Sequence, residues 1–124
     1  MVACKTDWKS TDFFNLADYT RITGNLAEAF SLTGLSPPSF RTLTVGAILQ
    51  QDDRRKISEA YNRLSDMYGG DPLDPEKPRW FSYAELNRIE HVCMQAETAY
   101  HKGQRYGAGL YFGAGATLGG GVFG

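Results

Sequence analysis

Apolar residues recur at spacings of three and four along three segments of this chain, the pattern of amphipathic helices. The first segment spans residues 15–30, the second begins at Asp52 or Asp53 and stops at Gly69-Gly70, and the third runs from about Tyr83 to about His101. The pattern predicts a mainly α fold, a small antiparallel bundle of about three helices. The side chains expected on its buried faces are Leu16, Tyr19, Ile22, Leu26 and Phe30, then Ile57, Tyr61, Leu64 and Tyr68, then Tyr83, Leu86, Ile89, Cys93, Ala96 and Tyr100.

The segments between these helices follow other patterns. Residues 1–12 are mostly polar around a single Trp8, which indicates an extended arm. Residues 40–50 are apolar and partly β-branched, so that they fit a short strand as well as a short helix capped by Thr44. The helical domain is expected to occupy residues 13–102.

An internal repeat marks the starts of the first and third helices, within residues 13–30 and 80–100. Asn15 stands three positions before Asp18, and Ser82 stands three before Glu85, each pair following an aromatic residue. An N-cap side chain followed three residues later by an acid is the signature of a capping box. A shorter echo of the repeat is Tyr61-Asn62-Arg63-Leu64.

The composition changes abruptly at residues 103–124, which hold nine glycines in 22 residues, no acid and Arg105 as the one full charge. A flexible linker would be polar, whereas this tail alternates glycine with large apolar residues. We expect it to order by assembly, pairing as strands with copies of itself or with a partner; a local hairpin or a disordered end is the alternative. Its large apolar residues are Tyr106, Leu110, Tyr111, Phe112, Leu118, Val122 and Phe123.

The overall charge and the cysteines narrow the possible functions. A net charge of −1 gives no basic footprint, so we expect no nucleic-acid partner. No stretch of apolar residues is long enough to span a membrane. No apolar stretch precedes Val2-Ala3-Cys4, so we expect no signal peptide, and the two isolated cysteines fit a reducing compartment.

No constellation of residues predicts catalysis, a metal or a cofactor. The glycine run at 113–119 lacks a following helix to bind phosphate. His91 and Cys93 are two positions apart and point to different faces of a helix, and prolines interrupt the acids of residues 71–76. We therefore expect a protein that is not an enzyme.

Three arginines occupy related places, because Arg21, Arg63 and Arg88 each directly precede a core aliphatic residue. One possibility is a local ion pair with the acid three or four positions earlier, namely Asp18, Glu59 or Glu85. The other is that these arginines reach across a helix–helix or subunit interface. We take them, with the large apolar residues of the tail, as candidate interface residues.

Two segments carry a resemblance to small structural proteins from the tail and baseplate region of bacteriophages and prophages, especially of Gram-positive hosts. One is Trp80-Phe81-Ser82-Tyr83-Ala84-Glu85-Leu86-Asn87-Arg88-Ile89-Glu90, and the other runs from Lys5-Thr6-Asp7-Trp8 to Asp18-Tyr19-Thr20-Arg21-Ile22. The glycine-aromatic tail is also similar to the ends of phage fibre proteins. The resemblance carries no catalytic residues.

The resemblance implies a structural virion protein, made in the host cytoplasm and built into the tail. Its partners would be copies of itself, as a trimer or hexamer, and other tail or baseplate proteins. The alternative is a stand-alone helical module that binds a peptide or regulates a partner, with an aromatic groove formed by Tyr19, Tyr61, Tyr83 and Tyr100.

Overall fold

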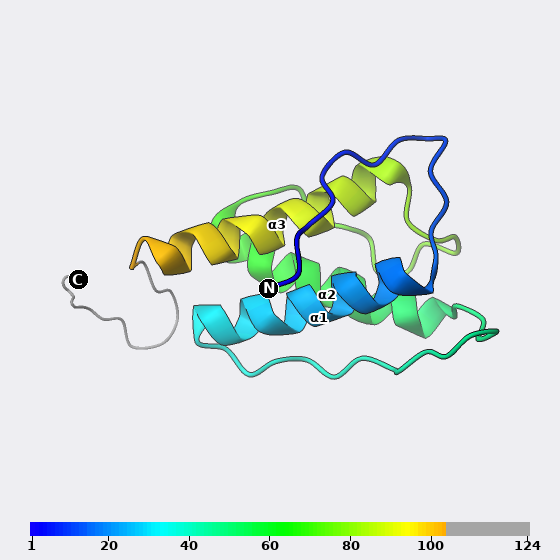
Figure 1. Ribbon diagram of the computed structural model, residues 1–124, viewed down its shortest axis with the longest axis horizontal. Helices are drawn as coiled ribbons and strands as arrows, with labels where there is room; N and C mark the ends of the chain where they lie inside the picture. Colours follow the sequence, from blue (N-terminus) through cyan, green and yellow to red (C-terminus); the bar gives the residue numbers. More distant parts are fainter. Residues whose placement is uncertain (104–124) are drawn as a thin grey trace.

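The computed structural model describes residues 1–103, in which three α-helices pack around one core (Figure 1). They are α1 (Leu16–Thr33), α2 (Gln51–Tyr68) and α3 (Tyr83–His101). The prediction of a mainly α bundle is confirmed. The β-forming tail that the sequence predicts lies outside the described residues.

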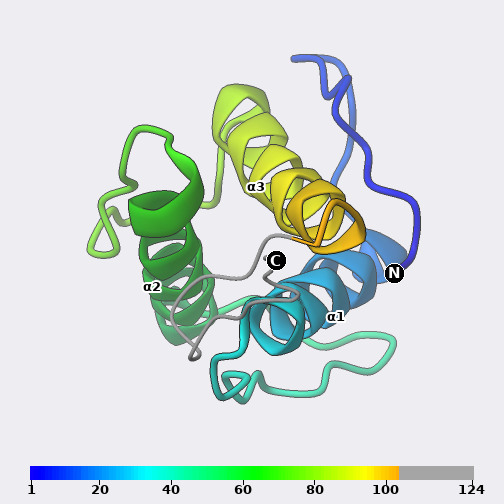
Figure 2. The ribbon, with the colours of Figure 1, turned by 90° about the vertical axis from the view of Figure 1, so that its left-hand side faces the viewer.

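The three helices run in the same direction, and the expectation of an antiparallel bundle is wrong (Figures 1 and 2). Arg54 in the first turns of α2 pairs with Glu85 in the first turn of α3, at 3.3 Å between Nη2 and Oε2. At the other end, the hydroxyls of Thr33 and Tyr68, the last residues of α1 and α2, are 2.6 Å apart. Neighbouring helices can be parallel because both connections are long enough to return along the bundle. A helix of 18 residues is ~27 Å long, and even the shorter connection, residues 69–82, can reach ~46 Å.

Capping interactions define where each helix begins. Asn15 Oδ1 accepts the backbone N–H of Asp18, whose carboxylate accepts the N–H of Asn15, and Ser82 and Glu85 form the same reciprocal pair. The predicted capping boxes are therefore confirmed. In α2 the cap is Gln50, not Asp52 or Asp53, because the Asp53 carboxylate reaches back to the Gln50 N–H at 2.8 Å.

Most of the predicted helix faces form the core, and the exceptions lie in the first and last turns of the helices. The first and the last apolar positions of α3, Tyr83 and Tyr100, are exposed. Leu16 and Tyr68 are only partly buried. A correct helical spacing therefore does not ensure burial in a terminal turn. The predicted positions that are buried are Tyr19, Ile22, Leu26, Phe30, Ile57, Tyr61, Leu64, Leu86, Ile89, Cys93 and Ala96.

Residues 40–50 form neither the strand nor the capped helix that the sequence allows. This segment is irregular apart from a turn at residues 45–46. Side chains hold its backbone in place: Tyr19 Oη donates to the carbonyl of Arg41 at 2.7 Å, and Arg41 Nη2 donates to the carbonyl of Ile48 at 2.9 Å. The segment is part of the connection that returns along the bundle to the start of α2 (Figure 1), with Leu43 and Leu49 packed against the core.

Asparagine side chains fasten the irregular segments to the helices. Asn87 Oδ1 accepts the N–H of Trp8 at 2.7 Å, and its Nδ2 donates to the Trp8 carbonyl at 3.1 Å. Asn62 brackets Leu73 in the same way, at 2.7 and 2.8 Å. Both bracketed residues insert their side chains into the core. The recurrence of Asn-Arg in the sequence therefore has a structural role, which is to anchor an extended segment on a helix.

Loss of the Asn87 bracket should destabilise the fold. We expect Asn87→Ala to lower the free energy of unfolding by about 2 kcal/mol, since it removes two hydrogen bonds worth about 1 kcal/mol each. Asn87→Asp keeps the acceptor for the Trp8 N–H and should lose less. Urea denaturation followed by circular dichroism measures both, with the exposed His91→Ala on the same helix as the control. If Asn87→Ala were as stable as the His91→Ala control, the bracket would not stabilise the fold.

Candidate functional site

The structure places the three candidate arginines in different surroundings. Arg21 makes the predicted local pair with Asp18 at 2.9 Å and also crosses to α3, where Nε and Nη2 donate to Glu90 at 3.0 and 2.8 Å. Arg88 donates to the backbone carbonyl of Asp71 at 3.2 Å. Arg63 is exposed and takes part in none of the ion pairs formed within residues 1–103. The candidate residues of the tail lie outside the described part of the chain.

Two of the expected local pairs are not formed, and one of them is replaced by a contact between distant segments. Glu85 pairs with Arg54 of α2 rather than with Arg88, and Glu59 forms no ion pair with Arg63 in the described part of the chain. The Arg54 guanidinium is buried and lies over the Phe81 ring, at 4.3 Å from its centroid. A buried guanidinium needs an anionic partner from another helix, which helical spacing alone does not reveal.

Glu90 is the central polar residue of the bundle, and the sequence analysis missed it. Its side chain is 1% exposed, and it accepts hydrogen bonds from Trp8 Nε1 at 2.6 Å, from the Lys5 N–H at 2.8 Å and from Arg21. One carboxylate thereby joins the arm, α1 and α3. A signal was present in the sequence, because Glu90 stands four residues after Leu86 and three before Cys93, on the buried face.

The end of the bundle where the helices begin carries an acid in the third position of each helix, and each acid meets an arginine. Asp53 pairs with Arg41, whose Nε is 3.1 Å from Oδ1. Hydrogen bonding from Arg41 lowers the pKa of Asp53 despite its burial. Burial alone would raise the pKa of Glu85, but hydrogen bonds from the Ser82 backbone and from Arg54 outweigh it and lower that pKa. These charges are thus committed to holding the fold.

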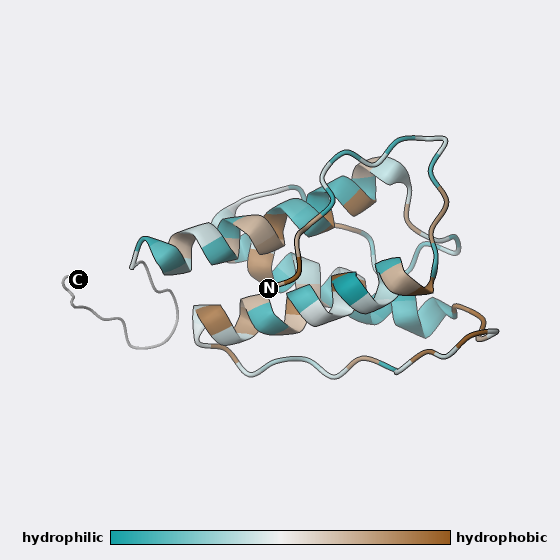
Figure 3. Cartoon of the chain, viewed as in Figure 1, coloured by the Kyte–Doolittle hydropathy of each residue, from teal (hydrophilic) through white to brown (hydrophobic). Residues whose placement is uncertain are grey.

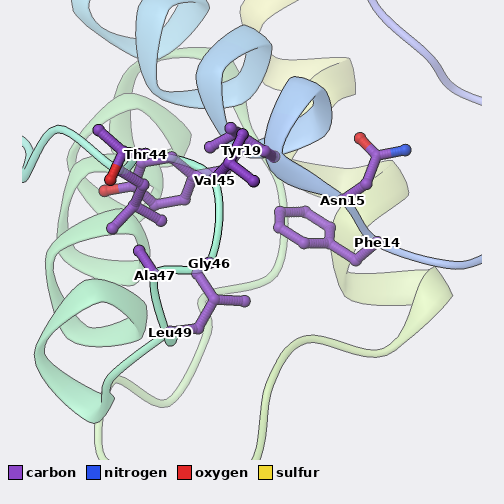
Figure 4. A pocket seen from close by; sticks show the side chains of 10 residues that line it. Phe14, Asn15, Tyr19, Thr44, Val45, Gly46, Ala47 and Leu49 are labelled. Carbon is purple, nitrogen blue, oxygen red and sulfur yellow. The ribbon is translucent and has the colours of Figure 1, made fainter.

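An apolar groove of about 270 Å³ opens at this same end, between the start of α1 and the segment of residues 43–49 (Figure 4). Phe14 lies on one side of it and Val45 and Leu49 on the other, with Leu16, Tyr19 and Leu43 also in its wall. No charged side chain lines it. The groove therefore suits apolar side chains and gives a charged ligand nothing to pair with.

Val45, which lines the groove, and Phe13 and Ile48, which are next to lining residues in the chain, are among the most exposed large apolar residues in residues 1–103. The exposed fractions are 89% for Phe13, 92% for Val45 and 79% for Ile48. Figure 3 shows hydrophobic stretches of the chain just before α1 and just before α2, at the end of the bundle where these helices begin. We refer to the groove together with Phe13, Val45 and Ile48 as the apolar end surface. Apolar side chains gathered in this way commonly mark an interaction site.

Two features of residues 1–103 bear on metal binding and on thiol chemistry. Within them, no group of three His, Cys, Asp or Glu side chains is placed to hold a metal ion. Burial raises the pKa of the Cys93 thiol well above its usual value, which disfavours the nucleophilic thiolate. None of the three helices has the length and apolar character needed to cross a membrane.

The aromatic groove expected for a peptide-binding module is not formed. Tyr19 and Tyr61 are buried in the core, whereas Tyr83 and Tyr100 are exposed in the first and last turns of α3. The Tyr61 hydroxyl instead donates to the carbonyl of Asp71 at 2.9 Å. That expectation is wrong because the four tyrosines do not share one surface.

Comparison with known proteins gives no relative: no family model matches the chain, and no curated protein or solved structure is found that is similar to it.

The buried Glu90 carboxylate should be essential for stability. We expect Glu90→Gln to lower the free energy of unfolding by about 3 kcal/mol, because it removes one of the two carboxylates that pair with Arg21 and turns an acceptor of four hydrogen bonds partly into a donor. Chemical denaturation measures the loss, with the exposed Glu59→Gln as the matched control. A Glu90→Gln protein as stable as its control would show that the cluster contributes nothing.

Acid should destabilise the bundle through the paired carboxylates. The pKa values of Asp53 and Glu85 are lower in the folded chain than in the unfolded chain, where they are about 4. Their stabilisation is therefore complete above about pH 5 and is lost as the pH falls through the folded values. We expect Asp53→Asn to lose less stability than the unchanged protein between about pH 6 and pH 3. Denaturant titrations at both pH values test this, with the exposed Asp66→Asn as the control; an unchanged acid loss in Asp53→Asn would contradict it.

Proposed function

We propose that this protein is a structural subunit of a phage tail, baseplate or fibre assembly, acting by packing against copies of itself and neighbouring proteins. The observation that carries the proposal is the apolar end surface, where Phe13, Val45 and Ile48 stand in solvent around an uncharged groove. An isolated chain gains nothing from this exposure, whereas a subunit buries it on assembly. The apolar tail adds further surface of the same kind.

The setting in a virion rests on the resemblance of residues 5–22 and 80–90 to tail and baseplate-region proteins. In the fold these two segments bind each other, through the Asn87 bracket on Trp8 and through the bonds from Arg21 and Trp8 to Glu90. The resemblance therefore concerns one contiguous unit of the structure rather than two separate helix starts. The direct contact between the two segments supports the proposal.

The proposal implies symmetric closure, as a trimer or a hexamer. Most oligomers of one chain close around a symmetry axis, because closure buries every copy of the interface. The apolar end surface and the tail would then be covered in the assembled particle. A stand-alone module that binds an apolar peptide in the groove is the second candidate, and it would remain monomeric.

Solution mass tests the proposal. We expect the full chain to form a discrete oligomer by light scattering after size exclusion, and Val45→Asp to shift it to monomer, because assembly would bury the new charge in an apolar contact. The control is Val2→Asp, which makes the same substitution at an exposed valine of the arm. A monomeric full chain would refute the structural role and favour the peptide-binding module.

A further inference from the structure

The groove and Gly103, the last described residue, lie at opposite ends of the bundle. The groove lies at the end where the helices begin, and Gly103 follows α3 at the end where all three helices stop (Figures 1 and 2). This separation follows from the parallel arrangement of the helices. In an antiparallel bundle the last helix could instead have ended beside the groove.

We propose that the groove of one copy receives residues 110–112 from the tail of the next copy, so that subunits join head to tail. The inference rests on the proposed structural function and names the partner of the apolar end surface. Leu110-Tyr111-Phe112 is the longest run of large apolar residues in the tail. An uncharged groove fits this uncharged segment, and the neighbouring glycines permit close approach of its backbone.

The length of the tail permits this contact. Residues 104–124 could extend to ~70 Å, whereas α3 with its 19 residues is ~28 Å long. Residue 110 lies only seven positions beyond Gly103, which corresponds to at most ~25 Å of chain. The run 110–112 can thus reach a groove on a copy stacked beyond the end of the bundle.

The same length argues against docking into the groove of the same copy. To reach it, the tail would have to return along the whole bundle, and seven residues, at most ~25 Å, fall short of the ~28 Å length of α3 even when fully extended. The outer faces along that path also carry other segments, since Asn25 and Asn87 hold the arm and Asn62 holds the connection before α3. The neighbouring copy is therefore the favoured source of the occupant.

A head-to-tail contact joins two different surfaces, the groove of one subunit and the tail of another. Such heterologous contacts close into a ring when the rotation between subunits permits and otherwise build a filament. Every subunit then uses its groove once and its tail once. If one variant lacks a working groove and the other lacks a working tail, a mixture of the two can therefore form only dimers.

Complementation between two full-length variants tests this inference. Val45→Asp disables the groove but keeps the tail, and Tyr111→Ser with Phe112→Ser disables the tail but keeps the groove. We expect each variant alone to be monomeric and their equimolar mixture to form a complex of twice the subunit mass, measured by light scattering. As a control, the tail variant mixed with a chain that carries all three substitutions should stay monomeric.

The outcomes separate this inference from the proposed function. An oligomeric full chain whose two variants do not combine would overturn the head-to-tail contact and leave the structural role standing. Assembly that persists in the tail variant alone would also overturn the contact. A monomeric full chain would overturn both.

Discussion

The buried carboxylate of Glu90 is the interaction on which the rest of the structure depends. A charge this deeply buried is tolerated only when ionic and hydrogen-bonding partners surround it. Arg21 supplies the charge from α1, and Trp8 and Lys5 supply N–H donors from the arm. Because both arm donors must meet the same carboxylate, Glu90 also determines where the arm lies on the bundle and how Trp8 enters the core. A small domain thereby gains core area from a segment that has no secondary structure of its own.

The parallel direction of the helices imposes a second constraint. All three helix starts, with their partial positive charge, lie at one end, and each carries an acid in its third position. Arginines from α1, from the segment after it and from α2 pair with those acids. The long returning connections require anchors as well, which the asparagine brackets on Trp8 and Leu73 provide. Most of the polar chemistry of the bundle is thus used to hold segments that helix packing alone would leave loose.

This use of polar groups is one reason why the apolar end surface carries so little charge. The acids in the third position of each helix are paired within the chain, whereas the segment before α2 presents Val45 and Ile48 to solvent. The two ends of the bundle consequently differ: one carries an uncharged groove, and the chain continues from the other into a glycine-rich apolar segment. A molecule with two unlike ends is suited to directional assembly, which is the physical basis of the proposed structural role.

Interactions between residues close together in the sequence determined the helices and the capping boxes at Asn15 and Ser82. They also determined the glycines that end the first two helices and most of the buried positions, because each of these features depends on neighbours within about one turn. The sequence also contains the Asn-Arg recurrence, but it does not show which segments the two asparagines anchor. Tertiary structure alone decided the parallel direction, the burial of Trp8 and Glu90, the pairing of Glu85 with Arg54 and the irregular path of residues 40–50. These features depend on groups tens of residues apart, such as Trp8 and Glu90, and their free energy comes from contacts that no local spacing encodes. The apolar groove belongs to the same class, since its two walls meet only when the chain returns along the bundle.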